Sequence, residues 1–506
     1  MWRITLIVAL TSALAVPATA GAARAMPRLH AERGASAAIA TADGRQVLLR
    51  GVNVNQLGDY WQQRADIPAT LPLTEADFAG IHALGMNVVR LLVHWSRLEP
   101  QRGHYDSAYL AEIRQAVAWA RRHNVYVVLD MHQDAWGKGV ATPKDESCPP
   151  GFSPQQGWDG APQWATLTDG LPTCRFQIRE VAPAVGQAWQ SFYLDRDGIQ
   201  TELVNTWAYL ARAFASEPTV AGYDLLNEPN TGYGPGVEDA SALGLFYNRA
   251  ITAIRAAESS QRHGFAHVVF WEPSVIWSAA AVDTTPPPPL VDDPNTVFSP
   301  HLYAESISAD GALGVHALTV EQGFANAGAV ARQYGTTVWS GEWGWFGDPQ
   351  ADAPAIARYA RQEDAHVWGG AWWDWKQSCG DPHMFGDGDS TQPGGVSPSL
   401  NRFRCPGNEP LGIPPTTERI LARPYVRSAP GRIGSLASDP AKGTLTASGS
   451  DPDPRGSCLI EAWAPGAARP AVSAAGIRRL RTRRVDGGWT VGGCARGNWH
   501  VAITTG

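Results

Sequence analysis

The sequence predicts a (β/α)8 barrel followed by a small all-β domain. Between about residues 45 and 375, short apolar runs alternate with segments of helical character. Short apolar runs of this kind are typical of parallel strands that helices cover on the outside. After about residue 420, Gly, Ser, Thr and Pro become frequent, and short alternating runs replace the helical segments. We therefore expect a barrel domain over residues 30–415 and a β-sandwich over residues 420–506.

Eight apolar runs account for the strands of the barrel. In chain order they are residues 47–53, 87–93, 125–132, 220–227, 267–271, 296–301, 336–341 and 368–373. Each run is nearly continuous, as expected for a strand that is buried on both faces. In a barrel built from such strands, functional side chains gather at the carboxyl ends of the strands.

Six segments between these runs have helical character. They are residues 74–84, 107–123, 200–214, 240–257, 320–334 and 354–362. Thr74 opens the first segment with a pattern close to a capping box, and Pro354 suits the first position of the last one. The crossover between the fifth and sixth strands is atypical, because residues 286–289 are all proline and forbid a helix there.

The first 25 residues have the pattern of an export signal. One positive charge precedes an apolar run over residues 4–16, and Ala18-Thr19-Ala20 offers small residues for cleavage. The apolar run is too short to span a bilayer comfortably, and no later segment is long and apolar enough. We expect a secreted, soluble protein from which residues 1–25 have been removed.

The cysteines agree with export. An even number of cysteines in an oxidising compartment predicts disulfides. Cys379 and His383 have no second ligand pair beside them, so no structural zinc is expected. Among the pairings that six cysteines allow, we expect the sequential one, which joins Cys148 to Cys174, Cys379 to Cys405, and Cys458 to Cys494.

Composition and charge exclude some classes of protein. Hydrophobic residues make up 44% of the chain and charged residues 18%, which is a globular composition. The chain has 41 Lys and Arg against 48 Asp and Glu, a net charge of −7, which argues against nucleic-acid binding. The arginines between residues 478 and 484 suit either a solvated strand or a transient contact with an anionic membrane surface.

Two long insertions and two carboxylates mark the expected site. Residues 136–190 follow the third strand and residues 377–415 the eighth, so both insertions leave from carboxyl ends of strands. Glu228 ends the fourth strand and Glu342 the seventh. Because an unpaired buried carboxylate is costly, such positions indicate either an ion pair at the rim or a functional site. Two facing carboxyl groups suit glycoside cleavage, in which one donates a proton and the other attacks the anomeric carbon.

These residues resemble glycoside hydrolase family 5, a retaining (β/α)8 family. Asn227-Glu228-Pro229 and Glu342 carry the resemblance at the fourth and seventh strands. Arg90 lies on the second strand, and similar motifs end three others, namely residues 129–134 at the third, 301–303 at the sixth and 370–375 at the eighth. The resemblance covers residues 45–375.

The resemblance implies a role for each of these residues. Glu228 would be the acid/base and Glu342 the nucleophile of a double displacement. Asn227 would donate to the sugar 2-hydroxyl, while Arg90 and Tyr303 would keep Glu342 ionised. The other implied sugar contacts are His132 and His301, which would line subsite −1, and Trp375, with Trp373 as the competing choice, which would stack under the sugar.

Within family 5, residues 130–134 and 160–172 resemble the endoglycoceramidase group. Enzymes of this group cut the β-glycosidic bond between a sugar chain and ceramide. The resemblance implies that Asp134 and Trp164 contact the first sugar and that no cofactor is needed. Some members carry a lysine after the first strand, whereas residues 53–60 have none, which leaves the preferred sugar open.

Two other functions remain. A family 5 endoglucanase or mannanase, or a β-glycosidase for another hydrophobic aglycon, would use the same two glutamates. A non-catalytic carbohydrate- or lipid-binding barrel would not need them. An open cleft would favour a polysaccharide and an apolar slot a lipid. We expect a monomer whose partner is a glycolipid or oligosaccharide substrate, with no metal and no nucleic acid.

Overall fold

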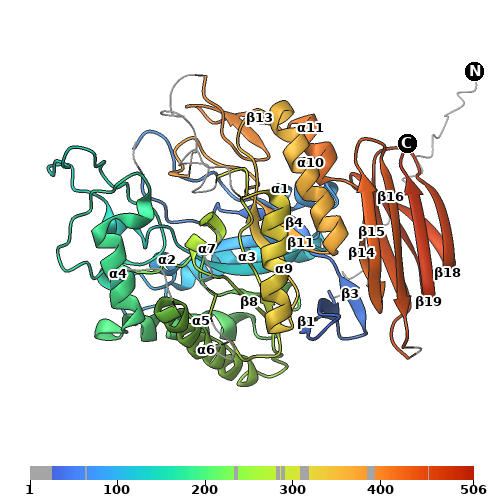
Figure 1. Ribbon diagram of the computed structural model, residues 1–506, viewed down its shortest axis with the longest axis horizontal. Coiled ribbons are helices and arrows are strands. Elements are labelled where there is room, and N and C mark those ends of the chain that lie inside the picture. Colours follow the sequence, from blue (N-terminus) through green and yellow to red (C-terminus); the bar gives the residue numbers. More distant parts are fainter. Residues whose placement is uncertain are drawn as a thin grey trace, which may run out of the picture.

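The computed structural model contains a barrel with a large antiparallel sheet against one end (Figure 1). It describes residues 26–62, 65–232, 237–280, 285–286, 291–307, 318–383, 394–453 and 455–506. The expected export signal, residues 1–25, lies outside these ranges. None of the helices within them has the length and apolar character that crossing a membrane requires.

Eight parallel strands form the barrel, which confirms the predicted fold. The strands are β4 (Arg50–Val54), β5 (Val88–His94), β6 (Tyr126–His132), β7 (Val220–Asp224), β8 (Val268–Trp271), β9 (Thr296–Phe298), β10 (Trp339–Trp343) and β11 (Gly369–Trp372). Their hydrogen-bonded order is β10-β11-β4-β5-β6-β7-β8-β9. A parallel bridge between Phe298 and Val338 brings the two ends of this order together. Every residue of β5 and β6 is buried, which explains their nearly continuous apolar sequences.

Helices cover the outside of the barrel. They are α1 (Glu75–Ala83), α2 (Trp95–Leu98), α3 (Ser107–Arg122), α4 (Pro183–Tyr193), α5 (Ile199–Phe214), α6 (Val237–Ser259), α7 (Val275–Ala280), α9 (Val320–Tyr334), α10 (Pro349–His366) and α11 (Pro415–Leu421). The predicted start of α10 at Pro354 was wrong. Asp348 accepts hydrogen bonds from the amides of Gln350 and Ala351, so the helix begins five residues earlier and Pro354 lies inside it. The crossover between β8 and β9 does contain a helix, α7, which ends before the proline run.

The antiparallel sheet contains both ends of the described chain. Its strands are β1 (Leu29–Glu32), β2 (Ala38–Thr41), β3 (Arg45–Val47), β14 (Tyr425–Pro430), β15 (Arg432–Asp439), β16 (Thr444–Asp451), β17 (Leu459–Pro465), β18 (Ala471–Val485) and β19 (Gly488–Thr504). The predicted first barrel strand is therefore divided. Val47 pairs with Ser428 of β14, while the barrel strand starts at Arg50. Strands β1–β3 thus belong to the same sheet as the C-terminal strands.

Buried ion pairs join this sheet to the amino end of the barrel. Arg423 donates to Glu363 at 2.6 Å, and Arg50 donates to Asp364 at 2.8 Å. The amide of Ser438 in β15 donates to the other oxygen of Asp364 at 2.9 Å. Because the charges are paired and buried, they hold the sheet in one position against the barrel.

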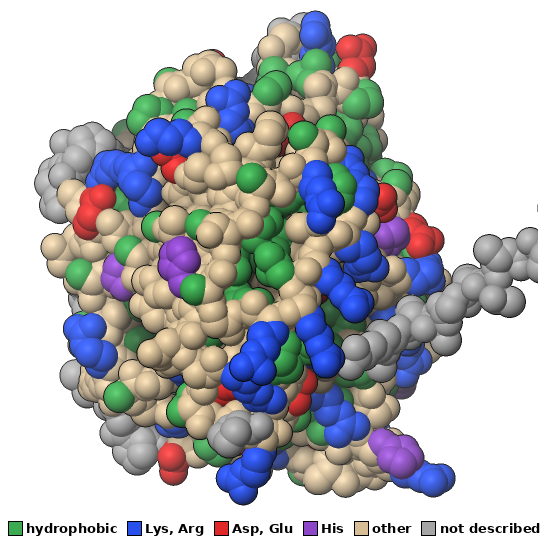
Figure 2. Space-filling view, turned by 90° about the vertical axis from the view of Figure 1, so that its right-hand side faces the viewer, with side chains coloured by type: hydrophobic (Ala, Val, Ile, Leu, Met, Phe, Trp, Pro, Cys, Tyr) green, Lys and Arg blue, Asp and Glu red, His purple; other side chains and the backbone are tan. Residues whose placement is uncertain are grey.

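Basic residues are numerous at this end of the molecule, which Figure 2 faces. A groove between the sheet and the barrel is lined by Arg45, Arg122, Arg427 and Arg483. The same groove contains Asn87 and Tyr126, which lie at the amino ends of β5 and β6. The arginines of β18 therefore lie at the opposite end of the barrel from the carboxyl ends of its strands.

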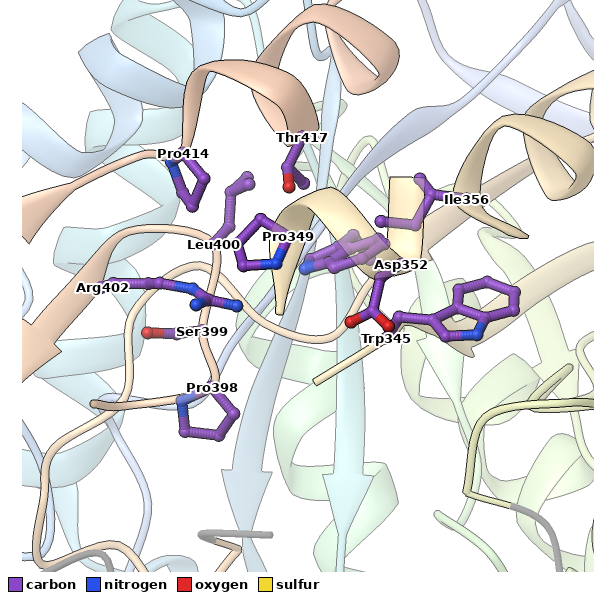
Figure 3. A pocket seen from close by; sticks show the side chains of 11 residues that line it. Trp345, Pro349, Asp352, Ile356, Pro398, Ser399, Leu400, Arg402, Pro414 and Thr417 are labelled. Carbon is purple, nitrogen blue, oxygen red and sulfur yellow. The ribbon is translucent and has the colours of Figure 1, made fainter. Parts of the chain in front are cut away.

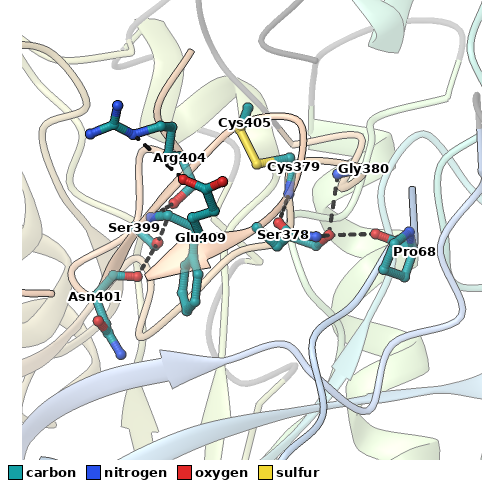
Figure 4. Close-up of a disulfide and its surroundings, with 12 residues drawn as sticks. Pro68, Ser378, Cys379, Gly380, Ser399, Asn401, Arg404, Cys405 and Glu409 are labelled. Atoms are coloured by element: carbon teal, nitrogen blue, oxygen red, sulfur yellow. Dashed lines mark hydrogen bonds and ion pairs between the residues drawn. A yellow bond between two sulfur atoms is a disulfide. The ribbon is translucent and has the colours of Figure 1, made fainter. Parts of the chain in front are cut away.

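The three predicted disulfides are confirmed. Cys148–Cys174 closes a loop in the insertion after β6, Cys379–Cys405 lies in the insertion after β11, and Cys458–Cys494 joins β17 to β19. Beside Cys379, the Gly380 amide donates a hydrogen bond to the Ser378 hydroxyl at 3.2 Å (Figure 4).

The insertion after β11 lines a hollow beside α10 (Figure 3). Leu400 of the insertion lines it together with Trp345 and Ile356. Arg402 donates to the Gly347 carbonyl at 3.0 Å, at the edge of the same hollow. This contact fixes the insertion against the loop that follows β10.

Candidate active site

The two predicted carboxylates face each other at the carboxyl ends of the barrel strands. Glu342 lies in β10 and Glu228 follows β7. A carboxylate oxygen of each and a ring nitrogen of His301 all lie within 4.8 Å of one another. The Glu342 side chain is buried, while that of Glu228 keeps 15% of its surface exposed, so a substrate can reach it. Glu228 has a φ of 37°, a left-handed backbone conformation that is uncommon for non-glycine residues.

Arg90 of β5 is fully buried beneath this pair. It donates to Glu342 at 2.7 Å and to the side-chain oxygen of Asn227 at 3.0 Å. Its other carboxylate partners lie at 2.8–2.9 Å and are Asp130, Asp224 and Glu272. One guanidinium therefore faces four carboxylates, and the negative charge exceeds what Arg90 alone can balance.

Tyr303 and His301 complete the contacts of the pair. Tyr303 donates to the second oxygen of Glu342 at 3.0 Å. The Nδ1 atom of His301 is 2.9 Å from Glu228 and 3.4 Å from Glu342, and its Nε2 atom is 3.2 Å from Glu272. His301 thus lies among three carboxylates, which favours its protonated form.

Burial and neighbouring charge separate the pKa values of the two glutamates. Burial raises the pKa of Glu342, and the charges of His301 and Arg90 offset this only in part. At Glu228 burial acts in the same sense, but the hydrogen bond and charge of His301 outweigh it and lower the pKa. At His301 the charges of Glu272 and Glu342 outweigh burial and raise the pKa well above its usual value. A general acid needs the higher pKa of such a pair, whereas here Glu342 has the higher pKa, because His301 lies against Glu228.

A family model places this site among known proteins. Residues 40–378, about two thirds of the chain, match the model for cellulase, glycosyl hydrolase family 5. The matched range includes every strand of the barrel and both glutamates. The chain belongs to glycosyl hydrolase family 5. It is therefore a glycoside hydrolase.

Curated relatives of this family 5 chain include endoglycoceramidases. Endoglycoceramidase I of Rhodococcus hoagii is 29% identical over 273 residues, which are 51% of this chain and 50% of that protein. Endoglycoceramidase of Hydra vulgaris is 28% identical over 264 residues, 46% of this chain and 47% of that protein. The chain thus matches about half the length of these curated relatives.

Solved structures extend the similarity to the whole chain. The crystal structure of an endogalactoceramidase is 47% identical, with a TM-score of 0.86 over 95% of this chain and 100% of the other. Endoglycoceramidase II from Rhodococcus sp. is 24% identical, with a TM-score of 0.70 over 92% and 98% of the two chains, and this likeness shows the shared fold.

Three other predicted residues of the family 5 site lie beside the glutamates. Asn227 donates to the Gln133 carbonyl at 3.0 Å and accepts from Arg90, so its amide is held in one orientation. His132 is oriented by Asp130 at 2.8 Å, and Asp130 raises the pKa of His132 to about 10 although burial opposes this. Trp373 stacks on His132 with ring centroids 5.6 Å apart.

The structure does not bring the other two predicted tryptophans to the glutamates. Trp375 donates to Asp77 at 2.9 Å and packs against Gly80 of α1, so Trp373 is the tryptophan at the site. The two tryptophans are two residues apart, but β11 ends at Trp372, so the alternation of side chains along a strand does not place them on one face. Trp164 donates to the Glu99 carbonyl at 3.1 Å and packs edge-on against Trp95, which are structural contacts.

Asp134 is buried between two cations that we did not single out as site residues. Arg179 forms an ion pair with one of its oxygens, and His383 contacts the other. Burial raises the pKa of Asp134, but Arg179 and His383 outweigh it and lower the pKa well below the usual value. Neither residue gives a signal in the sequence, because both lie in irregular insertions far from Asp134 along the chain.

Three other residues of the site, which the sequence analysis did not name, could have been found from the sequence. Asp130 and Asp224 are charged residues within apolar strands, and Glu272 directly follows β8. Burial raises the pKa of Asp224 to about 8. A charged residue within or directly after an apolar barrel strand would have pointed to all three.

Three groups of described side chains have the spacing of metal ligands. They are His132 with Asp134, Asp159 and His383; Glu228 with His301 and Glu342; and Asp130 with Asp224 and Glu272. In each group a basic side chain already contacts a carboxylate: Arg179, His301 and Arg90 respectively.

Proposed function

We propose that this family 5 hydrolase cleaves the β-glycosidic bond between a glycan and ceramide with retention of configuration. The observation that carries the proposal is the 47% identity with an endogalactoceramidase structure over 95% of this chain. Named endoglycoceramidases among the curated relatives support the same substrate class. Because that structure is of an endogalactoceramidase, a glycolipid with galactose in subsite −1 is the first substrate to test.

Glu342 is the nucleophile in this proposal. Arg90 and Tyr303 each donate to one of its oxygens, and both hydrogen bonds favour the ionised form and fix its direction. The short separation from Glu228, within 4.8 Å between oxygens, supports a covalent glycosyl intermediate. Inverting enzymes keep their carboxyl groups about 6.5–9.5 Å apart, which leaves room for a water molecule between them.

Glu228 and His301 together hold the proton for the leaving group. Because the pKa of His301 is raised and its Nδ1 lies 2.9 Å from Glu228, the pair keeps one proton at neutral pH. Two groups coupled in this way titrate as a unit, so a lowered pKa at Glu228 alone does not deprive the site of an acid. The proton passes from Glu228 to the departing oxygen, and Glu228 then activates the water that releases the sugar.

The remaining residues bind the sugar. The amide of Asn227 would donate to the 2-hydroxyl, and this hydrogen bond strengthens in the transition state. His132 and Asp134 would contact the hydroxyls of the first sugar. Trp373 provides the aromatic face on which the ring stacks.

Apolar side chains beside the site support a lipid aglycon. In the insertion after β6, Phe152, Phe176, Ile178 and Val181 are 44%, 51%, 41% and 52% exposed. The phenyl rings of Phe152 and Phe176 pack together at 5.9 Å, near the Cys148–Cys174 disulfide. We infer that membrane contact involves this end of the molecule. The arginines of β18 lie at the other end and would turn the glutamates away from a bilayer.

Analysis of the products by mass spectrometry tests the proposal. The purified protein is incubated with galactosyl-, glucosyl- and longer ganglio-ceramides, and in parallel with cello- and manno-oligosaccharides. We expect free ceramide and an intact glycan. Shortened oligosaccharides with untouched glycolipid would overturn the proposal in favour of a polysaccharide hydrolase with the same glutamates.

We also propose that residues 1–25 direct export. Three disulfides support this, because they persist in oxidising compartments. Sequencing the N-terminus of the protein recovered from culture medium should give a start between residues 20 and 30. An intact Met1 on active protein inside the cell would contradict export.

A further inference from the structure

Arg179 reaches from the first insertion into the site. It begins a short 3-10 helix over Arg179–Val181, five residues after Cys174. Its guanidinium carbon lies 4.5 Å from the centroid of the Trp158 ring, and the side chain is only 16% exposed. The ring and the burial keep the guanidinium in one place, so its contacts with the site have a defined direction.

The Nη2 atom of Arg179 bridges two carboxylates from different strands. It lies 3.5 Å from Glu228, which follows β7, and forms an ion pair with Asp134, which follows β6. Glu228 is thereby placed between two cations, with His301 at Oε1 and Arg179 at Oε2. Asp134 is likewise held between Arg179 and His383. No other described cation contacts both the predicted acid/base and a predicted sugar ligand.

We propose that Arg179 is a positioning residue that directs Glu228 toward the leaving oxygen and holds Asp134 against the first sugar. This proposal rests on the role of Glu228 as acid/base. It assigns a task to the disulfide-closed insertion, which carries a cation into the centre of the site. It also predicts that proton donation to the leaving group is the step that depends on the insertion.

The charges around Glu228 determine the sign of the effect on pH dependence. They are Arg179 and Glu180 from the insertion, Asp134 after β6, Glu272 after β8, His301 after β9, and Glu342 with Arg90 from β10 and β5. Arg179 favours the ionised form of Glu228, so its loss raises the pKa of that group. A general acid with a raised pKa stays protonated to higher pH. The alkaline limb of the pH profile of kcat/KM then moves to higher pH.

Two aryl glycosides separate positioning from simple stability. A 4-methylumbelliferyl β-galactoside needs proton donation to its leaving group, whereas a 2,4-dinitrophenyl β-galactoside does not. We expect Arg179→Gln to lower kcat for the first substrate about 10- to 100-fold, part of the general-acid contribution. The formation of the glycosyl-enzyme from the second substrate should change less than about threefold in rate, on the same grounds. KM should rise for both, because Asp134 loses a partner.

Matched variants complete the test. Arg179→Lys should recover part of kcat, since it keeps the charge but not the planar fork. Lys144→Gln removes an exposed charge from the same insertion and should leave both substrates and the pH profile unchanged. Equal losses on the two substrates with an unmoved alkaline limb would overturn the proposal, even if the melting temperature fell. If the wild-type protein hydrolyses aryl glycosides but not glycolipids, the proposed substrate fails while this comparison stays valid.

Discussion

The two ends of the barrel use buried charge in different ways. At the amino end, Arg50 and Arg423 face Glu363 and Asp364, so two cations meet two carboxylates. At the carboxyl end, Arg90 alone contacts four carboxylates. The balanced end joins the barrel to the antiparallel sheet. At the carboxyl end, the excess of carboxylates favours protonated side chains. A site whose side chains stay protonated near neutral pH can perform acid–base chemistry.

Substitution of the nucleophile should produce the largest effect. We expect Glu342→Gln to lower kcat by about 10⁴-fold or more, because the covalent step is lost. The isosteric amide keeps the shape of the side chain, so the fold should be retained. The rate with galactosylceramide and the circular dichroism spectrum are measured together. Full activity in a folded variant would remove Glu342 from the mechanism.

The amino end should respond in stability and not in chemistry. Arg423→Leu leaves Glu363 and Asp364 short of a buried partner, which should cost about 3–5 kcal/mol of unfolding free energy. Urea denaturation measures this cost, and kcat of the folded fraction should be unchanged. The control Lys442→Ala breaks the exposed pair with Asp439 and should cost under about 1 kcal/mol. A similar loss in both variants would contradict the difference between the two ends.

Two disulfides sharpen the same comparison. Replacing Cys148 and Cys174 by serine, or Cys458 and Cys494 by serine, should each cost about 3 kcal/mol if the closed loops act through the unfolded chain. The first pair should also lower kcat/KM, because Arg179 follows Cys174 by five residues and its position depends on this part of the insertion. The second lies in the antiparallel sheet and should leave kcat/KM unchanged. Equal effects of the two replacements on kcat/KM would show that the insertion after β6 has no particular role in catalysis.

The pH dependence of stability should have opposite signs at the two ends. The pKa of Asp224 is raised by burial from 3.8 to about 8 in the folded protein. Between these values the folded state binds a proton that the unfolded state has lost, so the free energy of unfolding falls as pH rises. Denaturation from pH 5 to 8 should show this decline in the wild type and a flatter curve in Asp224→Asn. Identical slopes in the wild type and the variant would show that a group other than Asp224 binds the proton.

Asp364 gives the opposite slope. Burial raises its pKa, but Arg423 and Arg50 outweigh burial and lower it below 3.8. Its contribution to stability is present above that value and is lost as pH falls through the lowered pKa. Acid denaturation of Asp364→Asn should therefore be less steep than that of the wild type below about pH 4.

The smallest effect distinguishes the two tryptophans after β11. Trp375→Phe loses the hydrogen bond to Asp77 and should cost about 1 kcal/mol with no change in KM. Trp373→Phe keeps an aromatic face beside His132 but a smaller one, and should raise KM a few-fold. The outcome is read from thermal denaturation and from steady-state kinetics. A higher KM in Trp375→Phe would restore the original expectation.

Much of this site was visible in the sequence because barrel topology converts order along the chain into position. Arg90, Asn227, Glu228, His301 and Glu342 each lie on or just after a predicted strand, and closing the barrel brings such positions together. The error at Trp375 arose where a strand ended earlier than its apolar run suggested. The place of residues 29–47 was missed because pairing with β14 depends on partners almost 400 residues away.

The barrel, the family, the three disulfides and the two facing glutamates could be predicted from the order of the residues, since local periodicity and motifs specify strands and the points where strands end. Which residues control those glutamates depends on the three-dimensional fold. Arg179 and His383 come from irregular insertions, and His301 lowers the pKa of Glu228 through one contact of 2.9 Å. Electrostatic interaction depends on distance and burial in three dimensions, and neither quantity is written in the order of the residues.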